Sequence, residues 1–419
     1  MSMSCLDYKI SRRAMLGATG ATLLGWQIRD LLAFEGNSHA PTAENVILFW
    51  NGGGMTHIDT WDPKPGRPTA GEFKPIKTSV PGMEISEIFP ELAKQMHHCS
   101  LIRSIAGTNG DHGRATYQLQ TSYNSSSNLL HPGLGSVVVH ERKQQGDLPA
   151  YITISGQAPR AGYLGQQCEA YFVAEPGEQD PYLAFPSGIA EVRGNKRLAV
   201  LEKFNQRFSN TQQNAKLDAT QTSINDAVKL MRSPALEAFD LNKVPTTTLN
   251  KYGDTPFGRG CILAKRLVET GVRFVQVNRG GFDTHTMNFP AMTGHGQVMD
   301  PALASLVSDL AESGLLKKTL IIMLSEFGRT PKINDDAGRD HWASVFSCFM
   351  AGGGIKGGQV IGSSDADGYQ PKDRPVQVPD IHATVCHALG IDPNKEVMTP
   401  LQRPMKLVDK GSLVKELFA

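Results

Sequence analysis

A chain of 419 residues is long enough for one large α/β domain or two ordinary ones. Its 42 Lys and Arg residues balance 41 Asp and Glu residues, which argues against a protein that wraps nucleic acid or carries a polybasic membrane anchor. The hydrophobic content of 40% excludes wholesale disorder, and six scattered cysteines without a CxxC pair argue against a zinc finger or a disulfide scaffold.

Residues 1–33 are predicted to be an export leader. Arg12 and Arg13 precede a weakly apolar stretch rich in Gly, Ala and Thr, and this order is typical of twin-arginine signals. The stretch is shorter than the roughly 20 residues that span a bilayer, so we expect no stable membrane span in the mature chain. An amphipathic N-terminal helix is the alternative interpretation. The leader predicts a periplasmic or extracellular protein, and it weakly favours a metalloprotein because this route exports folded proteins.

Beyond the leader, strand-like runs alternate with helix-like segments. Asn45 to Trp50 is a continuous apolar run that ends at three glycines, as expected of a strand buried on both faces. Further strands are predicted at 100–105, 149–155, 272–277 and 319–324, and helices at 86–96, 133–143, 255–270, 297–315 and 380–389. Such alternation implies an α/β fold with a mainly parallel sheet and helices on both faces. We expect one domain over 34–419, with a helical insertion around 205–250.

Polar residues that follow the predicted strands are the candidates for chemistry. In an open α/β sheet, ligands bind at the carboxyl ends of the strands. Three strand ends and one further loop deliver carboxylates and imidazoles, namely His57, Asp59, Asp283, His285, Glu326, Asp340 and His341. Oxygen and imidazole ligands suit Zn²⁺, Mn²⁺ or Ca²⁺, so we expect a divalent metal there, and its identity stays open.

Each of these groups also has a plainer explanation. Asp283 and His285 could form a turn with a surface histidine. Glu326 could simply pair with Arg329, the pair at 340–341 could lie in a loop without metal, and acids beside proline are ordinary turn formers. These alternatives weaken when taken together, because all of them would have to place acids or imidazoles at the same sheet edge by chance.

The order of six segments is similar to that of the DUF1501 family, whose pattern is related to sulfatases and alkaline phosphatases. The segments lie between about residues 44 and 392 and read GGGMTHIDTWDPKP, LIRSIAGTNGDHGRA, GVRFVQVNRGGFDTH, LIIMLSEFGRTP, GRDHW and DIHATVCHALGID. The resemblance implies an alkaline-phosphatase-like α/β fold that holds metal. It places metal ligands on Asp59 or His57, on Asp283 with His285 and on Glu326, and it assigns Asp340 and His341 to a later ligand or substrate-contacting pair.

Two departures from the superfamily pattern bear on activity. Glu326 and Phe327 stand where the superfamily enzymes have Asp-His or Asp-Asn, so the pattern lacks one metal ligand there. No residue matches the usual Thr, Ser or modified Cys nucleophile; Thr108 or Thr116 could serve, and His112 could be a ligand or a proton carrier. Without a nucleophile, either a metal-activated water or no hydrolysis at all would remain.

We therefore predict an exported metal-dependent hydrolase that acts on a phosphate or sulfate ester of a small molecule or a polysaccharide. His112 would carry a proton, Thr108 is the candidate nucleophile, and Arg329, Arg339 and Lys64 would face the oxyanion, which an arginine fork binds with two hydrogen bonds. The alternative is a non-catalytic binding protein of the cell envelope that keeps the fold. No nucleic-acid partner is expected, and the oligomeric state stays open.

Overall fold

The computed structural model describes residues 40–142, 146–178, 183, 189, 191–209, 224 and 227–418. The predicted leader at 1–33 lies outside the described residues. Residues 41–419 belong to one compact unit, the second of two in the chain. Within the described part of the chain, no helix combines the length and the apolar character that crossing a membrane requires.

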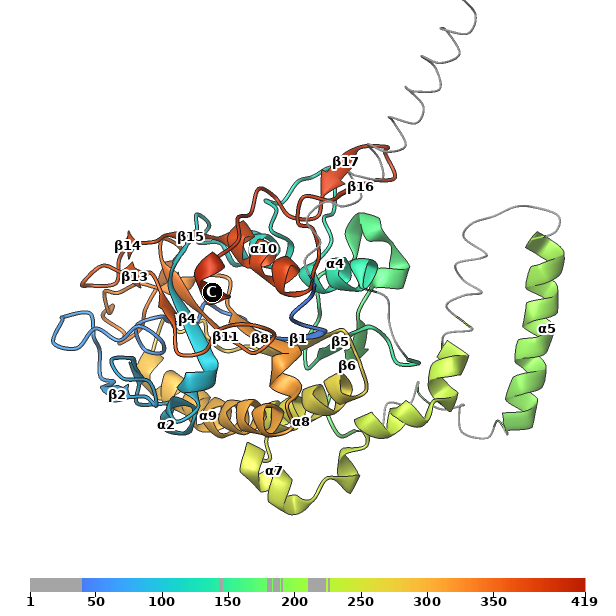
Figure 1. The fold of residues 1–419 in the computed structure, drawn as a ribbon, viewed down its shortest axis with the longest axis horizontal. Coiled ribbons are helices and arrows are strands. Elements are labelled where there is room, and N and C mark those ends of the chain that lie inside the picture. Colours follow the sequence, from blue (N-terminus) through green and yellow to red (C-terminus); the bar gives the residue numbers. More distant parts are fainter. Residues whose placement is uncertain are drawn as a thin grey trace, which may run out of the picture. The chain divides into compact units, whose positions relative to one another are not determined.

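Among these residues, a nine-stranded sheet forms the centre of the second unit (Figure 1). Its strands, in their order across the sheet, are β12 (Val360–Ile361), β4 (Cys99–Ala106), β11 (Phe346–Ala351), β8 (Thr319–Leu324), β1 (Asn45–Asn51), β7 (Phe274–Arg279), β5 (Tyr151–Ile154) and β6 (Tyr171–Val173), with β15 (Val376–Gln377) also paired to β4. Every pairing is parallel except the two made by β11, which is antiparallel to β4 and β8. The predicted α/β class with a mainly parallel sheet is confirmed.

Helices cover both faces of the sheet (Figure 1). Residues of α2 (Pro90–Ala93), α8 (Pro256–Glu269) and α9 (Asn288–Glu312) belong to one hydrophobic core, and residues of α3 (His112–Thr121), α4 (Leu134–Glu141) and α10 (Val378–Ala388) belong to the other. Strand β1 supplies both cores alternately: Ile47 and Phe49 join the first, whereas Val46 and Leu48 join the second. A strand covered on both faces must be apolar at every position, which explains its unbroken apolar run.

The remaining strands and α-helices of the described residues lie outside the nine-stranded sheet. They are β2 (Pro75–Lys77), β3 (Glu84–Ser86), α5 (Glu191–Ser209), α7 (Thr246–Tyr252), β9 (Gly328–Arg329), β10 (His341–Trp342), β13 (Ser363–Ser364), β14 (Pro371–Asp373), β16 (Glu396–Met398) and β17 (Pro404–Lys406). The helical insertion predicted around 205–250 coincides in part with α5 and α7, and most of residues 210–226 lie outside the described residues.

Most predicted elements are confirmed, and three differences have physical causes. The segment 86–96 is mainly turn and short helix. Helix α2 begins only at Pro90, with Phe89 as its N-cap, so the residues before it are not helical. Helix α9 begins nine residues before the predicted start at 297, and its first residue is tied down by the backbone of Ala337, which accepts a hydrogen bond from Asn288 N at 3.0 Å. Helix α3 was not predicted, although Asp111 caps it by accepting a bond from Arg114 N.

The reversed direction of β11 shapes one edge of the sheet. The carboxyl ends of β1, β4, β7 and β8 share one edge because these strands are parallel. Since β11 runs the other way, its first residue, Phe346, lies at that same edge. The segment just before β11 therefore reaches the edge at which the parallel strands end.

A buried histidine makes stability depend on pH. His382 of α10 is buried, and its Nε2 lies 2.8 Å from the carbonyl oxygen of Leu119. Burial lowers the pKa of His382 to about 4. The unfolded chain takes up this proton near pH 6.5 and the folded chain only near pH 4, so the free energy of unfolding should fall as the pH drops through that window.

Urea unfolding at about pH 7 and about pH 5 measures this dependence. The variant His382→Gln keeps a donor for Leu119 but cannot titrate, so we expect it to lose less stability than the parent between the two pH values. An equal loss in the two proteins would contradict the assignment.

Candidate metal centre

Acids and imidazoles from four segments of the chain meet at the carboxyl edge of the sheet. His112 starts α3 after β4, Asp283 and His285 follow β7, and Glu326 follows β8. His341 lies in β10, just before the reversed strand β11, and β10 pairs with β9 so that His341 is opposite Arg329. The sheet thus assembles groups that are up to 229 positions apart in the sequence.

The first imidazole, His112, is fixed by a buried carboxylate. Its Nδ1 donates to Glu326 Oε1 at 2.8 Å, the same oxygen that accepts a hydrogen bond from the backbone N of Gly53. Its Nε2 is buried, has no hydrogen-bond partner among the described residues and lies 3.4 Å from Asp283 Oδ2. The Nε2 of His112 therefore points toward Asp283.

The other two imidazoles repeat this arrangement. His285 Nδ1 donates to Asp340 Oδ1 at 2.7 Å, and His341 Nδ1 donates to the carbonyl oxygen of Gly110 at 2.7 Å. Their Nε2 atoms lie 3.1 Å and 3.3 Å from Asp283 Oδ1 and 2.9 Å from each other. Two imidazole lone pairs repel at this distance unless a proton or a metal cation lies between them.

The site therefore has the donor set of a metal centre. Ligand atoms of His112, Asp283 and His341 all lie within 4.8 Å of one another, and His285 contacts two of these three residues. Histidines that bind metals commonly donate the other ring nitrogen to a carboxylate or a carbonyl group, which fixes the tautomer. Glu326, Asp340 and Gly110 provide these acceptors here, so the described side chains fit a divalent cation.

Arg329 controls the charge at the centre. Partial burial acts to raise the pKa of Asp283, but hydrogen bonding and charge attraction from Arg329 prevail and lower it to about 2. Asp283 is consequently a carboxylate over the whole neutral range. Its side chain is 49% exposed, so a ligand can reach it from solvent.

Glu326, which the sequence predicts to be a metal ligand, is buried and contacts other protein groups. It is 3% exposed, and Oε1 accepts hydrogen bonds from His112 and from the backbone N of Gly53 at 2.8 Å each. Oε2 accepts from Ser325 Oγ at 3.1 Å. With these contacts, both oxygens of Glu326 have protein partners, and Glu326 orients the ring of His112.

The acids and imidazole that follow β1 lie apart from this cluster, contrary to the resemblance-based placement. Asp59 is fully buried and accepts two hydrogen bonds from Arg339, at 2.7 Å and 3.0 Å, and one from Asn288 at 2.8 Å. His57 is buried with its Nε2 2.9 Å from the carbonyl oxygen of Gly368, and burial lowers its pKa. Both oxygens of Asp59 have protein partners, and neither Asp59 nor His57 belongs to the group of ligand atoms that lie within 4.8 Å of one another.

The three cations predicted to face an oxyanion point their donors at protein groups. Arg329 is fully buried and donates to the carbonyl oxygens of Gly53 and Gly54 and to Asp283. Arg339, also fully buried, donates to Asp59 and to the backbone of Thr69, Thr330 and Pro331, and Lys64 pairs with Asp62 at 3.0 Å. The guanidinium groups of Arg329 and Arg339 therefore bind other parts of the protein and are not free to bind an oxyanion.

Thr108, the candidate nucleophile, lies exposed in the loop before α3, and its hydroxyl has no hydrogen-bond partner in the described part of the chain. Ser325, one residue before Glu326, is buried and donates to the carbonyl oxygen of Asn51 at 2.6 Å. Thr108 therefore has no base beside it, and Ser325, although 3.1 Å from Glu326 Oε2, is buried with its hydroxyl directed to the backbone of Asn51.

Two glycines allow the loops to approach closely. A Cβ atom on Gly53 would lie 2.4 Å from the backbone N of Asp283, and one on Gly54 would lie 2.5 Å from the ring of Phe327. Both residues also have positive φ angles, 118° and 82°. The glycine run after β1 therefore serves packing against Asp283 and Phe327.

Some site groups carry no signal in the sequence. The carbonyl oxygen of Gly110 is a backbone atom, which no residue pattern marks. Phe327 is fully buried, and its ring lies 4.9 Å from that of His112 and 4.6 Å from that of His341, so it forms an apolar wall behind both imidazoles. In the sequence, Phe327 is notable only because it stands where the superfamily pattern has His or Asn, and this gives no indication of its role beside the imidazoles.

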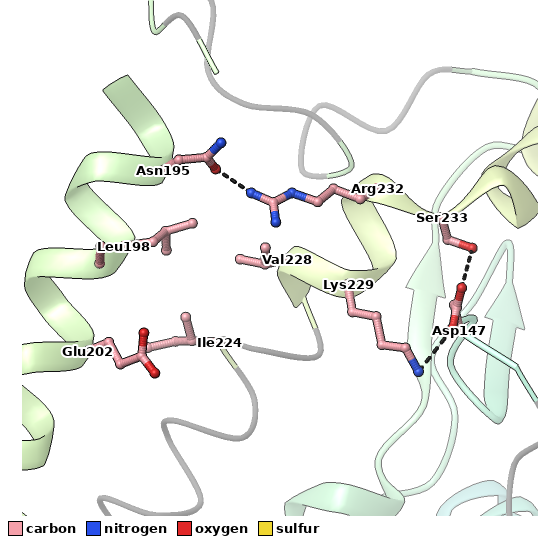
Figure 2. Close-up of a pocket in the computed structure, with 10 residues that line it drawn as sticks. Asp147, Asn195, Leu198, Glu202, Ile224, Val228, Lys229, Arg232 and Ser233 are labelled. Carbon is pink, nitrogen blue, oxygen red and sulfur yellow. Dashed lines mark hydrogen bonds and ion pairs between the residues drawn. The ribbon is translucent and has the colours of Figure 1, made fainter. Parts of the chain in front are cut away.

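One hollow in the described surface lies elsewhere (Figure 2). It separates α5 from Ile224 and residues 227–233 and is lined by both aliphatic and charged side chains, with Asp147 paired to Lys229 at 2.9 Å at one end. None of the predicted site residues lines it. The hollow therefore does not extend the cluster around Asp283.

Comparisons with known proteins place the chain in a family. A family model described as "Protein of unknown function (DUF1501)" matches residues 43–418. No curated protein matches the sequence.

Similar solved structures include three enzymes. They are a lipoteichoic acid synthase, LtaP, from Listeria monocytogenes (9% identity, 87% of this chain and 76% of that chain, TM-score 0.38), a sulfatase from Pseudoalteromonas sp. (14%, 87% and 70%, 0.36) and a 2-O GAG sulfatase (10%, 90% and 74%, 0.40). Likeness at this level gives no information on activity, so the proposals below rest on the site itself.

The buried pair of Asp59 and Arg339 allows a test of how the loops are held. Removing one partner leaves an uncompensated buried charge, so Asp59→Leu and Arg339→Met should each cost about 3 to 5 kcal/mol in the free energy of unfolding. The double variant should cost clearly less than the two single losses added together.

Urea unfolding of the four proteins measures this coupling. The exposed pair of Arg67 and Asp367, with contacts of 2.7 Å and 2.8 Å, is a matched control and should couple by no more than about 1 kcal/mol. Strictly additive losses at Asp59 and Arg339 would contradict the role given to that pair.

Proposed function

This chain belongs to the DUF1501 family, and we propose that it is an exported metal-dependent hydrolase of phosphate or sulfate esters. One observation supports this above all others: three imidazoles donate their Nδ1 hydrogens to fixed acceptors and direct Nε2 toward Asp283. Such convergence is costly for a fold to maintain without a cation, because the lone pairs repel one another.

His112, His285, His341 and Asp283 would hold the metal. Three nitrogens with one carboxylate suit Zn²⁺ or Mn²⁺ better than Ca²⁺, which prefers six or more oxygen ligands. A divalent cation supplies Lewis acidity, which draws electron density from an oxygen of an ester bound beside it.

The chain's own residues would set the position and charge of this centre. Glu326 and Asp340 hold two of the imidazoles in the tautomer that leaves Nε2 free. Arg329 keeps Asp283 ionised and, through Gly53 and Gly54, fixes it to the loop after β1. The half-exposed carboxylate gives a substrate access from solvent.

We infer that water is the attacking group. Thr108 has no base beside it, and the hydroxyl of Ser325 is hydrogen-bonded inward. In hydrolysis by water, the bond between phosphorus or sulfur and the leaving oxygen breaks, the oxygen of water forms the new bond, and the leaving oxygen takes up a proton. A candidate oxyanion contact must then come from groups other than Arg329 and Arg339.

The second candidate is a non-catalytic envelope protein that binds a metal ion or an ester through the same cluster. The inward-facing hydroxyl of Ser325 and the unassisted hydroxyl of Thr108 favour it, because neither provides an activated nucleophile. A screen with aryl phosphates, phosphodiesters and aryl sulfates separates the two candidates. Metal-dependent turnover excludes the binding protein, and tight metal binding without any turnover excludes the hydrolase.

The place of action is part of the proposal. The predicted leader at 1–33 with Arg12 and Arg13 supports export to the periplasm or the cell exterior. There the substrate would be a soluble ester or an ester carried on a polysaccharide. The chemistry of the cluster does not distinguish between these substrates.

Metal binding tests the proposal directly. We expect purified protein to hold about one tightly bound Zn²⁺ or Mn²⁺ per chain, as measured by elemental analysis and by calorimetric titration of the stripped protein. Asp283→Ala and His341→Ala should abolish tight binding, whereas His140→Ala, at an exposed histidine on α4, should leave it unchanged. Less than one ion per chain, together with full activity of the Asp283→Ala and His285→Ala variants, would overturn the proposal.

The carboxylate behind His112 gives a second test. Glu326→Gln keeps an acceptor oxygen but removes the charge, so it should weaken metal binding by about 10-fold to 100-fold while the protein stays folded. Glu175→Gln, at a carboxylate remote from the centre, is the control. An unchanged affinity in Glu326→Gln would show that the contact between His112 and Glu326 does not orient a ligand.

A further inference from the structure

Helix α5 exposes an unusual number of apolar side chains. Of the ten large apolar side chains that are exposed in the described chain, four lie on this one helix of 19 residues. They are Val192, Val200, Leu201 and Phe204, with exposed fractions of 67%, 52%, 40% and 62%. Apolar side chains gathered at this density mark a surface that binds something.

The opposite face of α5 already has a neighbour. Asn195, Leu198 and Glu202 point into the hollow beside residues 227–233, and Asn195 accepts a hydrogen bond from Arg232 (Figure 2). These positions are three or four residues apart, so they form one stripe along the helix. The exposed stripe that contains Val200 and Phe204 lies on the other side.

Cations share the exposed stripe. Arg193, Lys196, Arg197 and Lys203 are exposed, and no carboxylate of the described residues lies within 4.0 Å of them. Residues 193, 197 and 200 follow one another at helical spacing, as do 196, 200 and 204. The whole of α5 holds five cations and two acids, in a chain whose overall charge is only +1.

We propose that the exposed face of α5 adsorbs on an anionic phospholipid surface. Basic side chains are attracted to anionic headgroups, and Val200, Leu201 and Phe204 gain by entering the boundary between headgroups and acyl chains. The long stems of Lys196 and Arg197 let their charges stay at the headgroups while the apolar side chains enter.

The same charges argue against the other occupants. A second copy of α5 would set these cations against their own kind, which opposes pairing. A soluble polyanion would attract the cations but offer the apolar side chains no apolar phase. The combination of both kinds of side chain on one face therefore favours a bilayer surface, and this inference does not depend on the metal centre.

Flotation of the full chain with vesicles tests the proposal. We expect binding to vesicles that contain phosphatidylglycerol, little binding to pure phosphatidylcholine, and loss of binding at about 1 M salt, where the Debye length is only about 3 Å. Lys196→Gln combined with Arg197→Gln should weaken binding about 30-fold. Phe204→Ser should weaken it about tenfold.

Matched controls separate α5 from the rest of the chain, including the predicted leader. Lys77→Gln combined with Lys317→Gln removes the same charge elsewhere, and Leu401→Ser removes another exposed apolar side chain; both should bind as the parent does. No binding to phosphatidylglycerol, or equal loss in the α5 variants and the controls, would overturn the proposal. So would equal binding to dextran sulfate that Phe204→Ser leaves unchanged, because that result indicates a soluble polyanion as the partner.

Discussion

Two fully buried guanidinium groups join the loops on which the site depends. Arg329 binds the loop after β1 and the carboxylate of Asp283, and its Nη1 donates to the carbonyl oxygen of Arg339 at 3.0 Å. Arg339 in turn binds Asp59, and its backbone N donates to the carbonyl oxygen of Thr284 at 3.0 Å. A buried charge is stable only while its partners are in place, so the loops after β1, β7 and β8 are held in one arrangement.

This arrangement explains how residues far apart in the chain form one cluster. Parallel strands bring Asp283 and Glu326 to one edge, and the antiparallel strand β11 brings His341 to the same edge from the opposite direction. The imidazoles are then set by groups behind them, two carboxylates and the carbonyl oxygen of Gly110. The fold thus preorganises the three imidazoles and the carboxylate of Asp283. The cation we propose would enter a site that already exists.

Much of the fold could be predicted from the sequence, because the strands buried on both faces are continuous apolar runs and the long helices separate them. The grouping of Asp283, His285 and Glu326 also followed from the rule that parallel strands end at one edge, whereas His341 comes from the loop before the antiparallel strand β11. The role of Asp59 could not be predicted, because an acid after a strand looks the same whether it faces solvent, a metal or Arg339. Neither could the reversal of β11, since strand direction depends on long-range pairing and leaves no local pattern.

The same limit applies to the arginines. A sequence that places Arg329 and Arg339 beside candidate ligands predicts contact with an oxyanion, and only the burial of both side chains shows that their donors serve the backbone instead. The sequence of α5 is polar and basic, and it does not show which side chains are exposed. Only the fold shows which face of the helix is covered and which is open to solvent.

X-ray absorption at the metal edge of the Zn²⁺-loaded chain tests the central claim most directly, because it counts the ligands around the ion without requiring activity. The account predicts a first shell of nitrogen and oxygen with the outer-shell scattering of about three imidazoles, reduced by one imidazole in the His112→Ala variant. A spectrum of a hydrated ion without imidazole scattering, identical in the parent and in His112→Ala, would contradict it.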